Sequence, residues 1–326
     1  MTQKVLFIGG TGVISSACSA LAVERGIDLY LFTRGSSLRA APDGAKLIQG
    51  DINRPGEIDR VLAEHSFDTV VNWIVYQPDE VKRDIQIFAG KVGQYIFISS
   101  ASAYQKPVQK LPITEETPLE NPIWAYSRAK IACEELLIQA CDSGKLPVTI
   151  VRPSHTYDKT MLPVKGGYTT LDRIIREKPV IIHGDGTSLW VLTHHRDFAS
   201  GFVGLLGNQQ AIGEAYQITS DELLTWNGIY QMIADAVGKP LHPVHIPSDT
   251  IARLDPEWGE SLLGDKAHSV VFDNSKIKSL VPDFNPVIPY HEGCIETVNW
   301  YMEHPEVQIV DQDLTEVMDR LISIYN

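Results

Sequence analysis

Tyr126 and Lys130 are the side chains of this sequence whose types and spacing most clearly suggest chemistry. Residues four apart share one face of a helix, so the Lys130 ammonium and the adjacent charge of a cofactor would favour tyrosinate at Tyr126. Such a tyrosine can exchange a proton with a hydroxyl or carbonyl oxygen near neutral pH, and Ser100 is placed to hydrogen-bond the same oxygen. On its own the Tyr-x-x-x-Lys pattern is common on surface helices. Here it follows a run that ends in Ser99-Ser100, behind a glycine-rich loop.

The elements that must position these residues alternate between short β-branched runs and helical patterns, which is typical of a parallel sheet with crossover helices. We expect strands near residues 5–8, 28–33, 46–49, 69–73, 95–99 and 148–152, and helices over 13–25, 55–64 and 124–140. The predicted fold is α/β, a doubly wound parallel Rossmann sheet, with a smaller and partly discontinuous C-terminal substrate domain. The predicted division is 1–158 for the cofactor domain, which the chain re-enters at about 190–230, and 159–326 for the substrate domain.

A glycine-rich stretch, Gly9-Gly10-Thr11-Gly12-Val13-Ile14-Ser15, joins the first predicted strand to the first predicted helix. Glycine allows a tight turn and a close approach of the backbone to a pyrophosphate, whose charge then lies on free N–H groups at the helix N-terminus. An ordinary glycine-rich turn is the alternative. The position directly after a strand and before a helix favours a dinucleotide site.

The end of the second predicted strand lacks the acidic residue that would bind the adenosine ribose of NAD. It has Arg34, Ser36, Ser37 and Arg39 instead, and two guanidinium groups and two hydroxyls suit a 2′-phosphate. We therefore expect NADP in preference to NAD. Alternatively, Arg34 stacks on the adenine or lies in solvent.

Taken together, these features resemble the extended short-chain dehydrogenase/reductases of the NAD-dependent epimerase/dehydratase family. Further matches are Thr114-Glu115-Glu116-Thr117-Pro118, Arg152-Pro153-Ser154, Gly184-Asp185-Gly186-Thr187 and Arg196-Asp197-Phe198-Ala199, so that motifs cover about residues 4–205. The resemblance implies that Ser100, Tyr126 and Lys130 form a catalytic triad and that Asp51 contacts the adenine. The expected cofactor-binding residues are Gly9, Thr11, Gly12, Val13, Ile14, Arg34, Ser36, Ser37, Asp51, Ile52, Trp73, Ser99, Tyr126, Lys130 and Pro153.

The sequence departs from the family where substrates would be recognised. Trp190 stands where an arginine usually contacts a substrate diphosphate, which argues against a nucleotide sugar. This indole either stacks on a sugar or aromatic ring or fills the interdomain core. His155 replaces an asparagine and either binds substrate, relays a proton or serves a structural role. His194 is expected to line the same cleft.

Two further departures concern reaction type and assembly. Ala101 and Ser102 stand where dehydratases place an acid and base pair, so a dehydratase is disfavoured, and Ser102 is taken as a substrate contact. Trp73 replaces one of a pair of small residues and can crowd the nicotinamide side. The helix over 79–89 is shorter than in the family, where it often builds the dimer interface, so a homodimer is left open.

Composition narrows the class of protein. The chain has 326 residues, 44% of them hydrophobic, and a net charge of -13 without a Lys/Arg cluster, which argues against nucleic acid as a partner. Its four cysteines show no zinc spacing, and no metal site is expected. No apolar run approaches the ~20 residues of a membrane span, so we expect a cytoplasmic protein.

These observations favour an NAD(P)-dependent oxidoreductase or epimerase that acts on a hydroxyl or ketone of a sugar-like small molecule. A second hypothesis is a cofactor-sensing or RNA-associated binding module, similar to chloroplast stem-loop binding proteins. A third is a regulator-like or isoflavone-reductase-like protein that holds cofactor without chemistry. The retained pair of Tyr126 and Lys130 counts against both.

Overall fold

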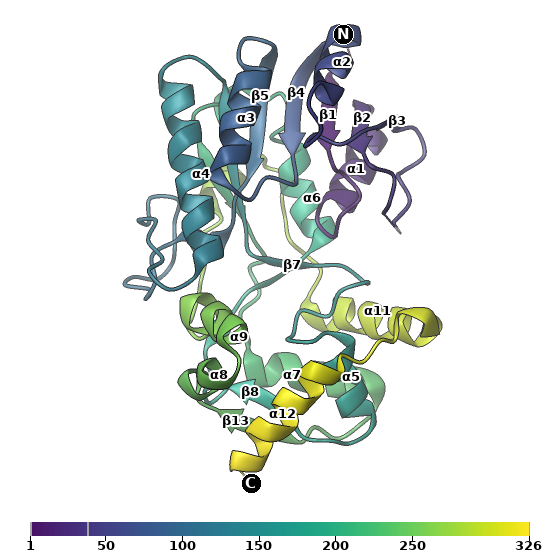
Figure 1. The fold of residues 1–326 in the computed structure, drawn as a ribbon, viewed down its shortest axis with the longest axis vertical. Coiled ribbons are helices and arrows are strands. Elements are labelled where there is room, and N and C mark those ends of the chain that lie inside the picture. The colour runs from purple at the N-terminus through teal and green to yellow at the C-terminus, as the bar shows by residue number, and fades with distance from the viewer. Residues whose placement is uncertain (1, 38, 326) are drawn as a thin grey trace.

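The computed structural model describes residues 2–37 and 39–325. Its centre is a parallel sheet of seven strands in the order β11-β6-β5-β4-β1-β2-β3 (Figure 1), so the predicted α/β fold and all six predicted strands are confirmed. The strands are β1 (Lys4–Ile8), β2 (Asp28–Thr33), β3 (Lys46–Gln49), β4 (Phe67–Asn72), β5 (Val92–Ile98), β6 (Val148–Pro153) and β11 (Ala215–Ile218). The seventh strand, β11, has no counterpart among the predicted strands, although it lies in the segment expected to return to the cofactor domain.

Alternating side chains of the strands produce two apolar layers. Val5 and Phe7 of β1 join the core that includes Phe198 and Phe202, whereas Leu6 and Ile8 join the opposite core. The helices against the first face are α1 (Ser15–Glu24), α6 (His195–Val203) and α10 (Ser275–Leu280). Those against the second face are α2 (Glu57–Glu64), α3 (Pro78–Phe88) and α4 (Ala125–Asp142). The sheet is therefore buried on both sides, as parallel sheets require.

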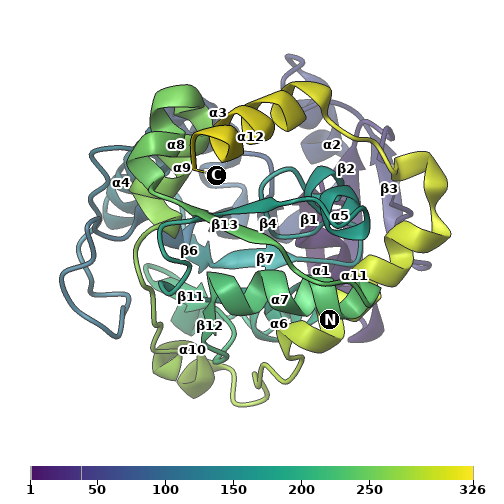
Figure 2. The ribbon, with the colours of Figure 1, turned by 90° about the horizontal axis from the view of Figure 1, so that it is seen from below.

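The remaining elements form the lower part of the molecule in Figure 1, and Figure 2 shows them from below. The helices are α5 (Tyr168–Ile175), α7 (Trp226–Val237), α8 (Ser248–Leu254), α9 (Pro256–Ser261), α11 (Tyr290–Glu303) and α12 (Gln312–Tyr325). Short strand pairs join β7 (His155–Tyr157) to β10 (Leu192–His194), β9 (Leu189–Trp190) to β12 (Leu224–Thr225), and β8 (Val180–His183) to β13 (Pro243–Ile246). An aromatic-rich core with Tyr157, Trp226 and Tyr290 among its members holds most of this part together, and a smaller core joins α8, α9 and α12.

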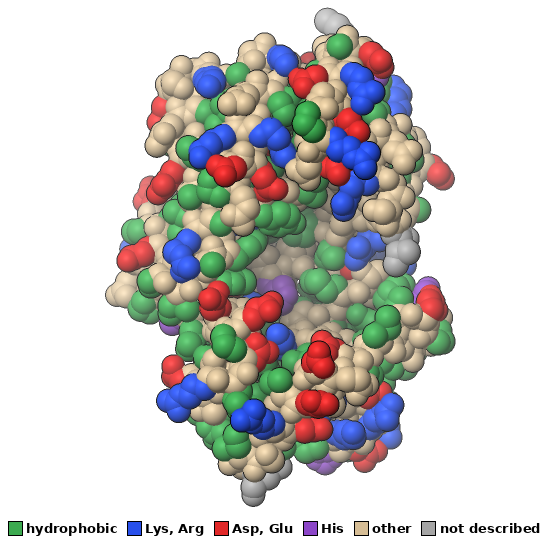
Figure 3. All heavy atoms as spheres, in the orientation of Figure 1, with side chains coloured by type: hydrophobic (Ala, Val, Ile, Leu, Met, Phe, Trp, Pro, Cys, Tyr) green, Lys and Arg blue, Asp and Glu red, His purple; other side chains and the backbone are tan. Residues whose placement is uncertain are grey.

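The strand order reverses between β1 and β4, and in doubly wound sheets ligands bind beyond the carboxyl ends of the strands at such a point. The surface is hollowed between the upper and lower parts of the molecule in Figure 3. In the ranges that the structure describes, no helix is long and apolar enough to cross a membrane.

Candidate active site

The glycine-rich loop between β1 and α1 is closely packed. Gly9 and Gly10 have φ of +96° and +104°, a region that favours glycine. A Cβ on Gly10 would lie 2.7 Å from Leu31 Cδ2, so a side chain cannot enter without displacing the buried side chain of Leu31 on β2. Among the described residues, the backbone N–H groups of Val13 and Ile14 have no acceptor. Free N–H groups at the start of a helix suit the phosphates of a dinucleotide.

A cavity of about 790 Å³ extends from this loop along the ends of β1, β2, β4 and β5. Its lining includes every residue that the sequence analysis assigns to the cofactor: Gly9, Thr11, Gly12, Val13, Ile14, Arg34, Ser36, Ser37, Asp51, Ile52, Trp73, Ser99, Tyr126, Lys130 and Pro153. Two of these have buried polar atoms with no partner among the described residues, the Nε1 of Trp73 and the Oγ of Ser99. The glycine turn, the free N–H groups and these unpaired atoms together fit a bound NAD(P).

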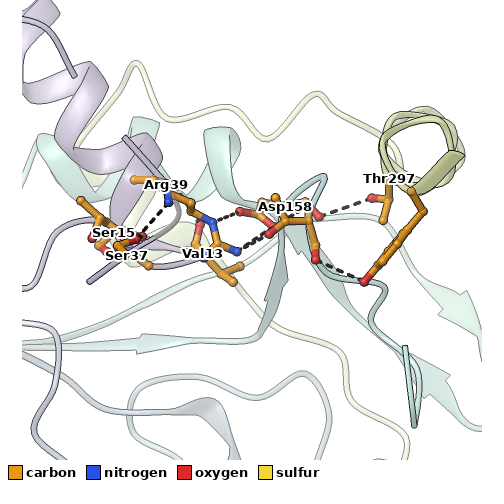
Figure 4. Close-up of polar contacts among 11 residues, drawn as sticks. Val13, Ser15, Ser37, Arg39, Asp158 and Thr297 are labelled. Atoms are coloured by element: carbon orange, nitrogen blue, oxygen red, sulfur yellow. Dashed lines mark hydrogen bonds and ion pairs between the residues drawn. The ribbon is translucent and has the colours of Figure 1, made fainter. Parts of the chain in front are cut away.

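The two arginines after β2 lie in different environments. The guanidinium of Arg39 already has partners within the chain. Its Nε lies 3.0 Å from Asp158 Oδ2, and its Nη2 donates to Thr160 (Figure 4). Asp158 in turn accepts a hydrogen bond at its backbone oxygen from Thr297 of α11 at 3.4 Å. Arg34 is exposed and forms no ion pair within the described part of the chain. Of the two guanidinium groups expected to face a 2′-phosphate, only Arg34 is therefore unengaged.

Ser100 and Tyr126 are brought together by β5 and α4. Ser100 follows the end of β5, and its Oγ lies 2.9 Å from the Oγ of Ser102, which also accepts a hydrogen bond from Ser127 at 2.8 Å. Burial raises the pKa of Tyr126 to about 12, although the interaction with Ser100 offsets part of this rise. The chain without cofactor therefore holds a neutral phenol at pH 7, whereas the tyrosinate expected from the sequence depends also on the charge of a bound cofactor. A neutral phenol is the form that donates a proton to a ketone oxygen.

Lys130 lies one helical turn after Tyr126 and is buried. Its Nζ donates to the carbonyl oxygens of Val75 at 2.7 Å and Ile98 at 2.8 Å, and lies 5.8 Å from the centre of the Tyr126 ring. Burial lowers the pKa of Lys130 to about 8. The ammonium is thus fixed between β4, β5 and α4, close enough to stabilise negative charge on the phenol oxygen when it forms.

A second cavity of about 270 Å³ adjoins the first, and Ser100 and Tyr126 line both. The candidate substrate residues Ser102, His155 and Trp190 also line it. The Nε1 of Trp190 donates to His155 Nδ1 at 3.3 Å, so the neutral imidazole carries its hydrogen on Nε2. Burial and the nearby Lys266 lower the pKa of His155 to about 3, and the ring remains a neutral donor at physiological pH. Trp190 therefore orients His155 in addition to packing on Trp226.

The depressed pKa of His155 predicts a dependence of stability on pH. Between about pH 3 and the ordinary value of 6.5, the unfolded chain binds a proton at this residue that the folded chain does not. Acidification therefore favours unfolding, and the contribution of His155 falls by about 1.4 kcal/mol per pH unit. Chemical denaturation of wild type and His155→Asn from pH 6 to pH 4.5 should show a shallower decline for the variant. Parallel declines would contradict the expectation.

His194 is not brought to any of the cavities described, contrary to its expected role in the cleft. Its side chain is fully buried, with Nε2 3.1 Å from Glu296 and Nδ1 accepting from the backbone N–H of Arg196. The ring caps the start of α6 and ties it to α11, so a substrate cannot reach it. Trp73 also has a structural contact, since its ring packs 4.8 Å from that of Phe202 beneath the cofactor cavity.

Arg152 and Glu134 connect the site to the core. Arg152, on β6, forms two hydrogen bonds with Glu134 of α4, at 2.6 Å and 3.1 Å, and both side chains are buried. Arg152 also donates to the backbone oxygen of Glu115, in the Thr-Glu-Glu-Thr-Pro segment, at 3.3 Å. The matched motifs around 114–118 and 152–154 thus support the helix that carries Tyr126 and Lys130.

Lys266 is the main residue of the site that sequence reasoning missed. It lines the second cavity and also a third, of about 340 Å³. No motif marks it in the sequence, because it reaches the site only through the packing of a π-helical turn, Leu262–Lys266.

Comparison with known proteins supports the Rossmann fold, and the matched region includes the glycine-rich loop. A model of the "NAD dependent epimerase/dehydratase family" matches residues 5–84 and 84–219. The 2′-dehydrokanamycin reductase of Streptomyces kanamyceticus is 26% identical over 289 residues, which cover 87% of this chain and 80% of that protein. The chloroplast stem-loop binding protein of 41 kDa b of Arabidopsis thaliana is 28% identical over 252 residues, 73% of this chain and 64% of that protein.

The epimerase Mth375 of Methanothermobacter thermautotrophicus has the same fold, with a TM-score of 0.74 over 94% of each chain at 17% identity. The chain belongs to the NAD dependent epimerase/dehydratase family, whose members bind NAD(P) on a Rossmann sheet.

Proposed function

We propose that this protein is an NADP-dependent oxidoreductase that interconverts a ketone and a secondary hydroxyl on a sugar-like small molecule. The observation that carries the proposal is the position of Ser100 and Tyr126, which line both the cofactor cavity and the adjoining second cavity. A reacting carbon between them would face the cofactor on one side and the phenol on the other.

Each residue of the cluster has a distinct part in reduction. The residues of the first cavity would hold NADPH, which would supply the hydride for the carbonyl carbon. Tyr126 donates its phenolic proton to the carbonyl oxygen, and Ser100 donates a hydrogen bond that holds this oxygen. Lys130 stabilises the negative charge left on Tyr126, and the Nε2–H of His155 binds a polar group of the substrate. In oxidation the same proton moves in the opposite direction.

Net reduction has more support than epimerisation or dehydration. The reductase relative matches most of both chains. Ala101 and Ser102 leave no acid and base pair for dehydration. An epimerase would use the same cluster but return the hydride to the same molecule. Stoichiometric consumption of NADPH with a panel of ketosugars, lost in Tyr126→Phe, tests the proposal. Tightly retained cofactor without net turnover would favour the epimerase instead.

Cofactor preference should depend on Arg34, the unengaged guanidinium at the adenosine end of the cavity. Arg34→Gln is expected to weaken the binding of NADPH about 10- to 100-fold, because a charge-assisted hydrogen bond contributes about 1.5–3 kcal/mol. The affinity for NADH should change by no more than a few-fold. Fluorescence titration of both cofactors measures this. Arg25→Gln is a matched control, since Arg25 is exposed beyond α1 and does not line the cavity. An equal loss of affinity for NADPH and NADH would show that Arg34 does not bind the 2′-phosphate.

A further inference from the structure

The second and third cavities meet at two side chains, His155 and Lys266. The second cavity contains the proposed reaction centre at Tyr126, and the third extends into the aromatic-rich core, where Trp226 and Tyr230 line it. A molecule that reacts at Tyr126 and reaches toward the third cavity must pass Lys266. The charge of this residue therefore affects what can bind.

The backbone of Lys266 is held firmly. Its carbonyl oxygen accepts a hydrogen bond from Trp226 Nε1 at 3.1 Å and lies 3.1 Å from His183 Nε2. These contacts come from α7 and β8 and fix the last residue of a π-helical turn, Leu262–Lys266. Such turns interrupt regular helices and are frequent at functional sites. A lysine anchored in this way can present its ammonium at a defined position.

The Lys266 ammonium lies against aromatic rings and not against a carboxylate. Its Nζ is 5.0 Å from the centre of the Trp124 ring and 5.9 Å from that of Trp190. In residues 2–37 and 39–325 it forms no ion pair and donates no hydrogen bond. The neighbouring lysines differ, since Lys106 pairs with Asp265 at 3.3 Å and Lys165 with Asp255 at 3.6 Å.

Burial lowers the pKa of Lys266, and the charge of the adjacent Asp265 offsets part of this fall. A buried or partly buried charge is stabilised by an opposite charge that also accepts its hydrogen bonds. Asp265, the adjacent carboxylate, is already engaged by Lys106. Lys266 itself is half-buried and lines both cavities, so its ammonium is free to pair with an anionic group of a bound ligand.

We propose that the substrate carries an anionic group, a carboxylate or a phosphate, that pairs with Lys266 while its reacting carbon lies at Tyr126. This inference rests on the proposed function and adds the charge of the substrate to it. The indole of Trp190 takes the place of a positively charged side chain in the family pattern, and Lys266, beside that indole, supplies a cation from a different part of the chain. The substrate class is thus an acidic or phosphorylated sugar.

Binding of glucuronate, glucose 6-phosphate and neutral glucose to the NADP-loaded protein tests the proposal by calorimetry. Wild type should bind one of the two anionic sugars at least tenfold more tightly than glucose, and Lys266→Gln should remove this preference. Lys266→Arg should retain most of it. Lys165→Gln is a matched control, because Lys165 lines the third cavity but already has an acidic partner. A preference for glucuronate indicates a carboxylate, and a preference for glucose 6-phosphate indicates a phosphate.

The proposal is wrong if wild type does not distinguish either anion from glucose, or if Lys266→Gln keeps the preference with an unchanged melting temperature. NADP affinity, measured on the same samples, separates this failure from that of the proposed function. The protein could bind NADP and reduce a ketosugar in a Tyr126-dependent way, yet bind anionic and neutral sugars equally. That result would contradict only the role of Lys266.

Discussion

Tyr126→Phe is expected to lower kcat for ketone reduction by about 10²- to 10⁴-fold, the range that a positioned proton donor contributes. The ring would remain between the two cavities, but the only acidic hydrogen at the reacting oxygen would be that of the Ser100 hydroxyl. Since the phenol of Tyr126 is protonated at neutral pH, the loss should appear in kcat, whereas NADPH affinity should stay within a few-fold.

Initial rates at saturating NADPH, with cofactor affinity measured separately, provide the test. Tyr157→Phe is a suitable control, because Tyr157 lies outside the three cavities and its buried hydroxyl has no partner among the described residues. It removes the same atom with no expected loss of rate. Full activity in Tyr126→Phe would rule out the proton-transfer role.

Glu134→Gln is expected to lower the free energy of unfolding by about 3–5 kcal/mol, because it leaves the buried guanidinium of Arg152 without its counterion. The side chain of Glu134 is fully buried, so water cannot replace the lost charge. Urea denaturation measures the change. Since α4 carries Tyr126 and Lys130, the variant should also lose turnover well below its melting temperature.

Two further variants make this expectation specific. Glu135→Gln changes the adjacent residue, which is exposed, and should alter stability by no more than about 0.5 kcal/mol. Glu134→Leu combined with Arg152→Met should recover much of the loss, because an apolar pair leaves no buried charge uncompensated. A stability of Glu134→Gln equal to that of wild type would show that the ion pair contributes nothing.

The sheet and the cofactor cavity could be predicted because both depend on local patterns. Buried runs such as residues 5–8 and 28–33 are long enough to form strands, and the glycines at 9 and 10 mark a turn that other residues adopt poorly. In a parallel sheet the carboxyl ends of the strands lie at one edge, so Asp51, Trp73, Ser99 and Pro153 were bound to meet there.

The substrate side could not be predicted in the same way, because distant segments build it. Lys266 reaches the cavity through hydrogen bonds to its carbonyl oxygen from α7 and β8, which no sequence spacing reveals. Asp158 engages Arg39 across the two parts of the molecule. His194 was expected in the cleft from its position near a motif, but the backbone N–H of Arg196 holds its ring at the start of α6.

Lys130 is a cross-link as well as a source of charge. Its ammonium joins α4 to the carbonyl oxygen of Val75 beyond β4 and to that of Ile98 on β5. A substitution that removes the amine detaches three elements at once, so a collapsed pocket and a missing catalytic partner would cause the same loss of turnover. Among Ser100, Tyr126 and Lys130, a substitution of Lys130 therefore changes the packing of the pocket and the rate of turnover together.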